Sequence, residues 1–236
     1  FQGYAAHYYC GTAGTATEYS TGQWYHLLDR ALEMETLVRQ QRAILDGYDP
    51  GRKVGLVVDE WGAWHPAEEG INPRHLYQQN TQRDALVAAL TLDIFNRHAD
   101  KVAMANIAQT INVLQAMVLT HGARMLTTPT YHVYAMYTEH QGNRAVRALV
   151  EDDTIDWADA EADTSGAITQ LTGSASLGDG ALTVSLVNAH ADEALDATLA
   201  LYGYKGTVET RTTLAADDIH ARNTFETPDR VTPRVD

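Results

Sequence analysis

Short apolar runs alternate with longer amphipathic segments over about the first 141 residues. Residues 54–58, Val-Gly-Leu-Val-Val, form a short and mostly β-branched run, which predicts a strand buried on both faces of a parallel sheet. Residues 3–6 and 101–109 predict two further short strands. Polar side chains follow the central strand at once, and parallel folds place their chemistry at the carboxyl ends of strands.

Two longer segments between these strands carry apolar residues at helical spacing. Residues 32–45 and 80–98 each place apolar side chains on one face of a helix, and residues 111–119 predict a third helix. Gly47 and Pro50 mark the end of the first helix. Because strands and helices alternate, we expect parallel strand pairing with right-handed crossovers.

The pattern changes after residue 141 to an alternation of polar and apolar residues with a period of two. Gly-Asp-Gly at 178–180 predicts a hairpin turn, and residues 195–202 and 206–214 predict further strands. The expected fold is therefore α/β plus all-β, with a boundary between residues 1–141 and residues 142–236. The second part is expected to be an antiparallel β-sandwich.

Composition narrows the class of partner. The chain has 236 residues, of which 44% are hydrophobic, and a formal net charge of −14. That charge argues against nucleic acid and anionic membranes as partners, because both select clustered Lys and Arg. No run approaches the about 18 apolar residues of a membrane span. The chain opens on Phe1, and we interpret it as the later part of a longer polypeptide.

Asp59 and Glu60 are the strongest candidates for chemistry, since they follow the central strand. Retaining glycoside hydrolysis uses two carboxyl groups about 5–5.5 Å apart, one as nucleophile and one as general acid/base. Trp61 and Trp64 would suit the wall of a sugar site, because sugar C–H faces stack on aromatic rings. The structural alternative is that the acids cap the following loop and the tryptophans belong to the core.

Two further segments offer polar side chains. His7 and Tyr9 share one face of an extended segment, and a Tyr hydroxyl can hold a carboxylate ionised and oriented. Asn106, Gln109 and Asn112 carry amides that suit sugar hydroxyls, although helix capping would explain them equally well. The ten histidines show no spacing typical of metal ligands, so no metal site is expected.

Five sequence words carry a resemblance to a known family. They are HYY, VDEWGAWH, MANIAQTINVLQAM, TTPTYHVYAMYTEHQG and NTFETPDRVTP, and they occur in this order from about residue 5 to residue 235. Together they resemble the C-terminal half of a glycoside hydrolase family 51 α-L-arabinofuranosidase. The resemblance implies the C-terminal part of a (β/α)8 TIM barrel followed by a β-sandwich of jelly-roll type.

The resemblance also implies roles for particular residues. Glu60 would be the catalytic nucleophile, with His7 and Tyr9 beside it. Gln109 would contact a sugar hydroxyl, and Trp64 would form part of the substrate-binding wall. Members of that family often have Asn after the first Trp of the motif, where this chain has Gly62, a change expected to soften the loop.

The family's general acid/base lies in a Gly-Asn-Glu motif, and these residues contain no such motif. The chain is expected to supply only the last three strands of the barrel, so we expect it to hydrolyse glycosides poorly by itself. One general acid contributes about 10²–10⁴-fold to rate.

The leading hypothesis is a retaining exo-α-L-arabinofuranosidase that acts on arabinan, arabinoxylan or arabino-oligosaccharides. No cofactor is implied, and family members often form homo-oligomers. A single cysteine, Cys10, and the habit of the family favour a cytoplasmic location. Two alternatives stay open: a non-catalytic carbohydrate-binding or assembly fragment, and a retaining glycosidase of another barrel family.

Overall fold

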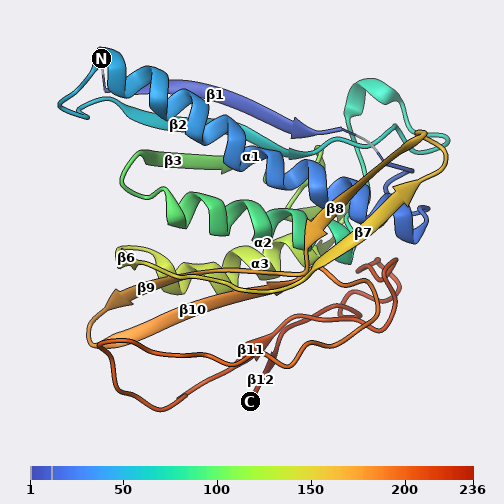
Figure 1. Ribbon diagram of the computed structural model, residues 1–236. Coiled ribbons are helices and arrows are strands. Elements are labelled where there is room, and N and C mark those ends of the chain that lie inside the picture. The colour runs from blue at the N-terminus through green and yellow to red at the C-terminus, as the bar shows by residue number, and fades with distance from the viewer. Residues whose placement is uncertain (1, 12) are drawn as a thin grey trace.

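A computed structural model describes residues 2–11 and 13–236 of the chain (Figure 1). The first part contains three parallel strands in the order β1-β2-β3, joined by two long helices. Their bounds are β1 Gly3–Cys10, α1 Thr21–Tyr48, β2 Gly55–Ala63, α2 Gln82–Arg97 and β3 Val102–Ile107. The predicted strand-helix order and the parallel pairing are confirmed.

Helix α1 begins and ends where its local sequence directs. Ser20 caps it by accepting the N–H of Gln23, while the Gln23 side chain accepts the N–H of Ser20, which together form a capping box. The helix ends at Tyr48, between the predicted stop signals Gly47 and Pro50. It is longer than residues 32–45 because its first three turns also pack into the core.

Strand β2 is buried on only one face. The side chains of Leu56 and Val58 are fully buried in the core that includes residues of α1 and α2, whereas Val57 is half-buried. The prediction of a strand buried on both faces is therefore wrong for the residues described. The opposite face of the sheet carries Met104 at 55% exposure, so it has an apolar surface that is open to solvent.

Residues 111–119 do not form the predicted helix. Asn112 and Leu114 adopt positive φ angles of 59° and 52°, which an α-helix does not accommodate. The segment is instead a loop that runs into a two-stranded hairpin. The elements that follow are β4 Val118–His121, β5 Arg124–Thr127, α3 Pro129–Tyr137 and the short 3-10 helix η2 Thr138–His140, and the other 3-10 helix is η1 Pro73–His75.

The second part of the chain forms small antiparallel sheets. One sheet has the order β10-β9-β6, and β7–β8 and β11–β12 are separate pairs. The bounds are β6 Arg144–Val146, β7 Thr154–Asp159, β8 Thr164–Thr169, β9 Leu171–Gly178, β10 Ala181–Asn188, β11 Thr212–Thr213 and β12 Arg234–Val235. The predicted turn at 178–180 is confirmed, since Asp179 and Gly180 both have positive φ.

The predicted strands at 195–202 and 206–214 are wrong, apart from Thr212–Thr213. Alternation alone does not make a strand, because a strand also needs a hydrogen-bonding neighbour. Within residues 2–11 and 13–236, segment 195–210 is paired with no other strand, and Tyr202 is 94% exposed. The described residues form neither a closed barrel nor a closed sandwich.

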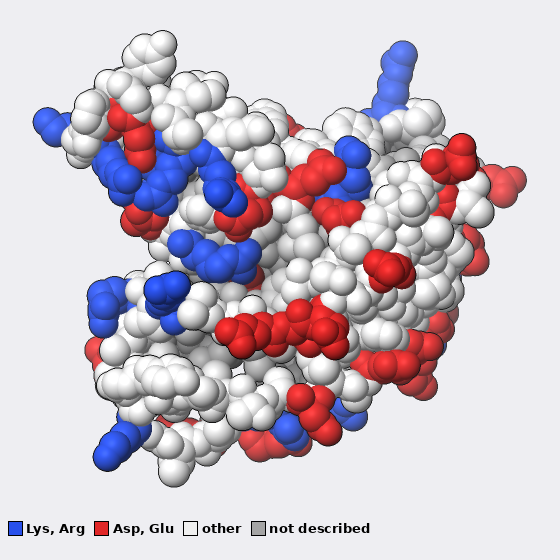
Figure 2. All heavy atoms as spheres, in the orientation of Figure 1, with Lys and Arg blue, Asp and Glu red and all other residues white. Residues whose placement is uncertain are grey.

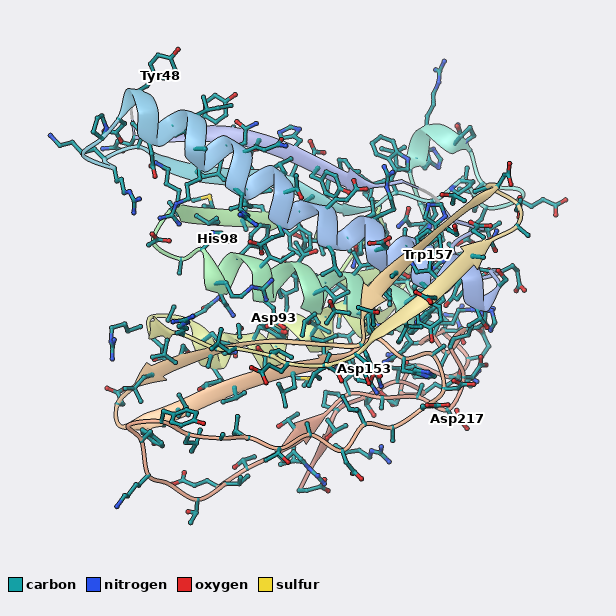
Figure 3. All side chains as sticks on the ribbon, viewed as in Figure 1. Tyr48, Asp93, His98, Asp153, Trp157 and Asp217 are labelled. Carbon is teal, nitrogen blue, oxygen red and sulfur yellow. The ribbon has the colours of Figure 1, made fainter. Side chains whose placement is uncertain are left out.

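Helix α2 lies between the parallel sheet β1-β2-β3 and the hairpin β9–β10 (Figure 1). On one side it packs against α1 and β2, and on the other it packs against β9 and β10. Asp93 faces the second side, where its Oδ1 accepts the hydroxyls of Ser174, Ser185 and Tyr137 at 2.8, 2.5 and 2.9 Å (Figure 3). A buried carboxylate thus joins the helix to the hairpin.

Charge is unevenly distributed over the surface. Asp and Glu are spread over much of the face shown in Figure 2, whereas Lys and Arg gather around the notch at its left. An ion-pair network connects the end of α1 to the α2–β3 connection, with Arg42 and Arg52 paired to Asp100, and Lys101 to Asp46. Among the described residues, no helix combines the length and apolarity that would let it cross a membrane.

Candidate active site

Strands β1 and β2 bring the candidate residues together through an irregular register. Ala5 pairs with Val57, but the next pair is His7 with Glu60, so three steps along β2 match two steps along β1. This is the geometry of a β-bulge, which inserts one extra residue and re-aims nearby side chains. As a result Asp59 and Glu60, which are adjacent in the sequence, both face His7.

Glu60 has a polar neighbour at each carboxylate oxygen. The Tyr9 hydroxyl donates to Oε1 at 2.7 Å, and His7 Nδ1 lies 3.0 Å from Oε2. The Glu60 side chain keeps 36% of its surface exposed, so the carboxylate is oriented but still reachable. His7 and Tyr9 lie inside β1 and not just beyond a strand, and Asp59 and Glu60 likewise lie inside β2.

His7 joins the two carboxylates. Its Nε2 lies 3.0 Å from Asp59 Oδ1, while its Nδ1 faces Glu60. The two ring nitrogens thus face two different carboxyl groups, and one imidazole lies between Asp59 and Glu60.

Tyr9 connects the carboxylate to an aromatic wall. Burial, the hydrogen bond to Glu60 and the charge of Glu60 raise the pKa of Tyr9 well above its usual value, so the hydroxyl stays protonated and remains a donor. The ring of Trp64 meets the Tyr9 ring edge to face, with centroids 5.1 Å apart. Trp64 is 42% exposed, which leaves an aromatic surface beside Glu60's hydrogen-bonding partner.

Trp61 belongs to the core instead. It is 1% exposed, and its ring packs against Phe95 and Tyr134 at centroid distances of 5.4 and 6.3 Å. Both readings of the two tryptophans therefore apply, one to each residue: Trp61 packs in the interior and Trp64 stands at the surface.

The three amides of residues 106–112 differ in their surroundings. Asn112 is structural, because its side chain donates to Thr120 Oγ1 and accepts the Thr120 N–H, both at 2.7 Å. Asn106 and Gln109 are exposed at the carboxyl end of β3, which pairs with β2. Because β2 and β3 are parallel, Gln109 lies at the same edge of the sheet as the carboxyl end of β2, which contains Glu60.

Gly62 lies in β2 and not in a flexible loop, so the expected softening is wrong. Its φ of 144° is unfavourable for a residue with a side chain, and a Cβ there would lie 3.1 Å from Gln115 Oε1. Gln115 is one of several buried polar residues around the end of β2 that sequence reasoning missed. A single sequence gives no signal that an amide far along the chain folds against this strand.

Three potential metal ligands meet elsewhere among the described residues. Side-chain ligand atoms of His190, Asp192 and Glu193 lie within 4.8 Å of one another. His190 Nδ1 accepts the backbone N–H of Glu193 at 3.0 Å, so this lone pair is already engaged in a local turn. This group does not involve the residues around Glu60.

Comparison with known proteins identifies the family. Residues 59–236 match the family described as α-L-arabinofuranosidase C-terminal domain. The chain belongs to this family. Its matched region begins at Asp59, so it includes Glu60 and Trp64 and extends through both parts of the structure.

Relatives of this arabinofuranosidase domain are similar along nearly the whole chain. An intracellular exo-α-L-arabinofuranosidase of Bacteroides ovatus is 38% identical over 98% of this chain and 45% of its own length. An intracellular exo-α-(1→5)-L-arabinofuranosidase of Streptomyces lividans is 28% identical over 87% of this chain and 33% of its own.

A solved structure agrees with the arrangement described above. The GH51 arabinofuranosidase of Xanthomonas axonopodis pv. citri superposes with a TM-score of 0.88 at 37% identity, covering 100% of this chain and 48% of that one. The chain thus spans about half the length of the first relatives that it matches.

Proposed function

We propose that this chain is the part of an exo-α-L-arabinofuranosidase that carries the catalytic nucleophile, Glu60. The proposal depends mainly on one observation: the Tyr9 hydroxyl donates to Glu60 Oε1 at 2.7 Å, and His7 Nδ1 lies 3.0 Å from Oε2. A nucleophile gains most when its orientation is set before the substrate arrives. The ionised carboxylate is the reactive form of a glutamate nucleophile.

The proposed reaction proceeds with retention of configuration. Glu60 attacks the anomeric carbon of a terminal, non-reducing α-L-arabinofuranosyl group. The glycosidic C–O bond breaks, and its electron pair leaves with the departing oxygen, which takes a proton from a general acid outside this chain. Water then attacks the anomeric carbon, gives one proton to the group that served as general acid, and displaces the Glu60 carboxylate.

Other residues would bind the sugar. Trp64, set edge-on to Tyr9, offers a surface for the C–H face of the ring. Gln109 is exposed near the end of β3 and would contact a sugar hydroxyl. The substrates would be arabinan, arabinoxylan or arabino-oligosaccharides, which are neutral and therefore compatible with a net charge of −14.

The fold of the whole enzyme is part of the proposal. Strands β1, β2 and β3 would be the last three of a (β/α)8 barrel formed by residues 1–141 with other segments, and residues 142–236 would form a jelly-roll sandwich. Exposed Tyr4 and Met104, at 41% and 55%, support further strands or side chains beside the open sheet face. We also expect the enzyme to form a homo-oligomer.

A pair of matched variants tests the role of Glu60. In the enzyme that contains this chain, Glu60→Gln should lower the hydrolysis of an aryl α-L-arabinofuranoside by roughly 10⁴-fold or more. Asp59→Asn removes the neighbouring charge from the same His7 and should retain far more activity. Equal losses in the two variants would contradict the assignment of the nucleophile to Glu60.

Trapping the intermediate supplies a direct test. An activated 2-fluoro arabinofuranoside should add one sugar to the peptide that contains Glu60, as measured by mass spectrometry, and should not label the Glu60→Gln variant. Turnover without a labelled peptide would indicate another mechanism. Sugar binding with no turnover in the whole enzyme would favour a non-catalytic binding module.

The chain alone should be nearly inactive, because it contains no Gly-Asn-Glu motif. Addition of the complementary half should restore hydrolysis by about 10²–10⁴-fold. Full activity of the isolated chain would show that the general acid lies within these residues.

A further inference from the structure

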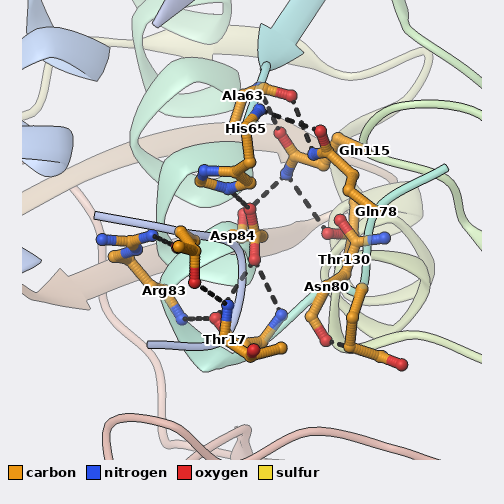
Figure 4. Close-up of polar contacts among 12 residues, drawn as sticks. Thr17, Ala63, His65, Gln78, Asn80, Arg83, Asp84, Gln115 and Thr130 are labelled. Carbon is orange, nitrogen blue, oxygen red and sulfur yellow. Dashed lines mark hydrogen bonds and ion pairs between the residues drawn. The ribbon is translucent and has the colours of Figure 1, made fainter. Parts of the chain in front are cut away.

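Two buried glutamines hold the segment that follows Glu60. The Ala63 N–H donates to Gln115 Oε1 at 2.8 Å, and the Ala63 carbonyl accepts from Gln78 Nε2 at 3.0 Å (Figure 4). The His65 N–H donates to Gln78 Oε1 at 2.9 Å. The two glutamines are 0% and 2% exposed, so the backbone on both sides of Trp64 is fixed from the interior.

The His65 side chain adds a second anchor. Its Nε2 lies 2.8 Å from Asp84 Oδ1, and both side chains are completely buried (Figure 4). Asp84 Oδ2 accepts the Thr81 N–H at 2.7 Å, which is part of the capping box of α2. Gln115 also donates to the Asp84 carbonyl at 2.7 Å. The segment after β2 is thereby tied to the first turn of α2.

These contacts leave Trp64 as the exposed side chain of residues 63–65. Ala63 and His65 are buried, and Trp64 between them is 42% exposed. The Trp64 ring contacts Tyr9, whose hydroxyl donates to Glu60. A shift of the anchored backbone would therefore move the ring relative to Tyr9 and to the carboxylate.

We propose that Gln78 and Gln115, with the His65–Asp84 pair, are positioning residues that set the Trp64 ring as the wall of the sugar site. The inference depends on the proposed function for the role of Trp64 toward substrate. It adds that binding of the terminal sugar depends on amides that never touch it. Displacements of about 1 Å by remote residues can cost about 100-fold in rate.

A double-mutant cycle in the enzyme that contains this chain tests the coupling. Gln78→Met preserves length but removes both side-chain hydrogen bonds, and it should raise KM for an aryl α-L-arabinofuranoside by about 10-fold with a smaller change in kcat. In a Trp64→Ala background the same change should add less than about 2-fold, because it acts through the missing ring. Equal effects of Gln78→Met on KM in both backgrounds would overturn the proposal.

Gln23→Met is the matched control. Gln23 is also buried and its side chain also makes two hydrogen bonds, to the Ser20 N–H at 2.9 Å and to Glu161 at 2.8 Å, but none to residues 61–65. It should leave KM unchanged. A KM increase equal to that of Gln78→Met would show that general loss of stability explains the effect, and would overturn the proposal.

A measurement without turnover separates this inference from the proposed function. With 5-fluorotryptophan incorporated into the enzyme that contains this chain, the Trp64 ¹⁹F resonance, assigned by its loss in Trp64→Ala, should shift or broaden in Gln78→Met and stay unchanged in Gln23→Met. If Trp64→Ala leaves KM unaltered, the wall role in the proposed function fails, while the resonance still tests the positioning. An unaltered Trp64 resonance in Gln78→Met would refute the positioning itself.

Discussion

The Tyr9 hydroxyl donates to Glu60 Oε1 at 2.7 Å across two parallel strands. Tyr9 pairs in register with Gly62, two residues beyond Glu60, so its side chain reaches back along the sheet to the carboxylate. Burial and Glu60 raise the pKa of Tyr9. Its hydroxyl therefore keeps its proton, and remains a donor, at neutral and mildly basic pH.

Tyr9→Phe should lower kcat/KM by about 10–100-fold, because a hydrogen bond to a charged group contributes about 1.5–3 kcal/mol. Steady-state kinetics on an aryl α-L-arabinofuranoside would measure it. Tyr8→Phe is the control, since the Tyr8 hydroxyl donates to the Arg30 carbonyl of α1 and not to Glu60. Similar losses in both variants would show that the hydroxyl of Tyr9 has no special role.

Gly62→Ala should lower the free energy of unfolding by about 1–3 kcal/mol, because the φ of 144° is strained for alanine and the new Cβ would crowd Gln115. Gly47→Ala should instead raise it by about 0.5–1 kcal/mol, since Gly47 lies in α1 with nothing within 4 Å of a new Cβ. Urea denaturation of the two variants checks both signs, and stabilisation by Gly62→Ala would be inconsistent with this geometry.

Asp93 should make stability fall as the pH rises. Burial, opposed by the hydroxyls of Ser185, Ser174 and Tyr137, raises the pKa of Asp93 to about 6 from an ordinary 3.8. The folded state therefore holds this proton more tightly than the unfolded state. The resulting stabilisation of the fold is fully present below about pH 4 and is lost as the pH rises through about 6. Relative to wild type, Asp93→Asn should gain about 3 kcal/mol between about pH 4 and pH 7. A difference independent of pH would mean that Asp93 titrates normally.

Asp84 should show the opposite dependence. Burial alone would raise its pKa, but His65, Arg83 and the Thr81 N–H outweigh burial and lower the pKa of Asp84. The ionised carboxylate thus stabilises the folded state above about pH 4, and this contribution is lost as the pH falls further. Asp84→Asn should cost about 3–5 kcal/mol near pH 7, as expected when one partner of a buried pair is removed. Denaturation near pH 7 and at pH values below about 4 would measure this cost, and a cost that does not shrink in acid would contradict the lowered pKa of Asp84.

Local patterns predicted the regular elements of the first part well. The apolar run at 54–58 and the stop signals Gly47 and Pro50 depend only on neighbouring residues, and β2 and α1 follow them. The loop at 111–119 was missed because its amphipathic spacing also fits a helix, whereas the decisive feature, positive φ at Asn112 and Leu114, depends on tertiary contacts.

The candidate site was only partly accessible from the sequence. His7, Tyr9 and Glu60 were proposed from their spacing and from the resemblance, and the structure brings them into contact. Their arrangement depends on the register of β1 against β2, which no pattern within either strand determines. Gln78 and Gln115 could not be found at all, because isolated glutamines give no periodic signal of burial.

Successive side chains of a regular strand point to opposite faces of the sheet. A side chain on a neighbouring strand can therefore contact every second residue, but not two consecutive residues. The extra residue of β2 interrupts this alternation between Val58 and Trp61. The consecutive residues Asp59 and Glu60 can therefore both contact the imidazole of His7. Beyond that point the buried series resumes with Trp61 and Ala63. Two charges thus occupy one face without displacing a single core side chain, a local density of charge that an uninterrupted strand cannot present.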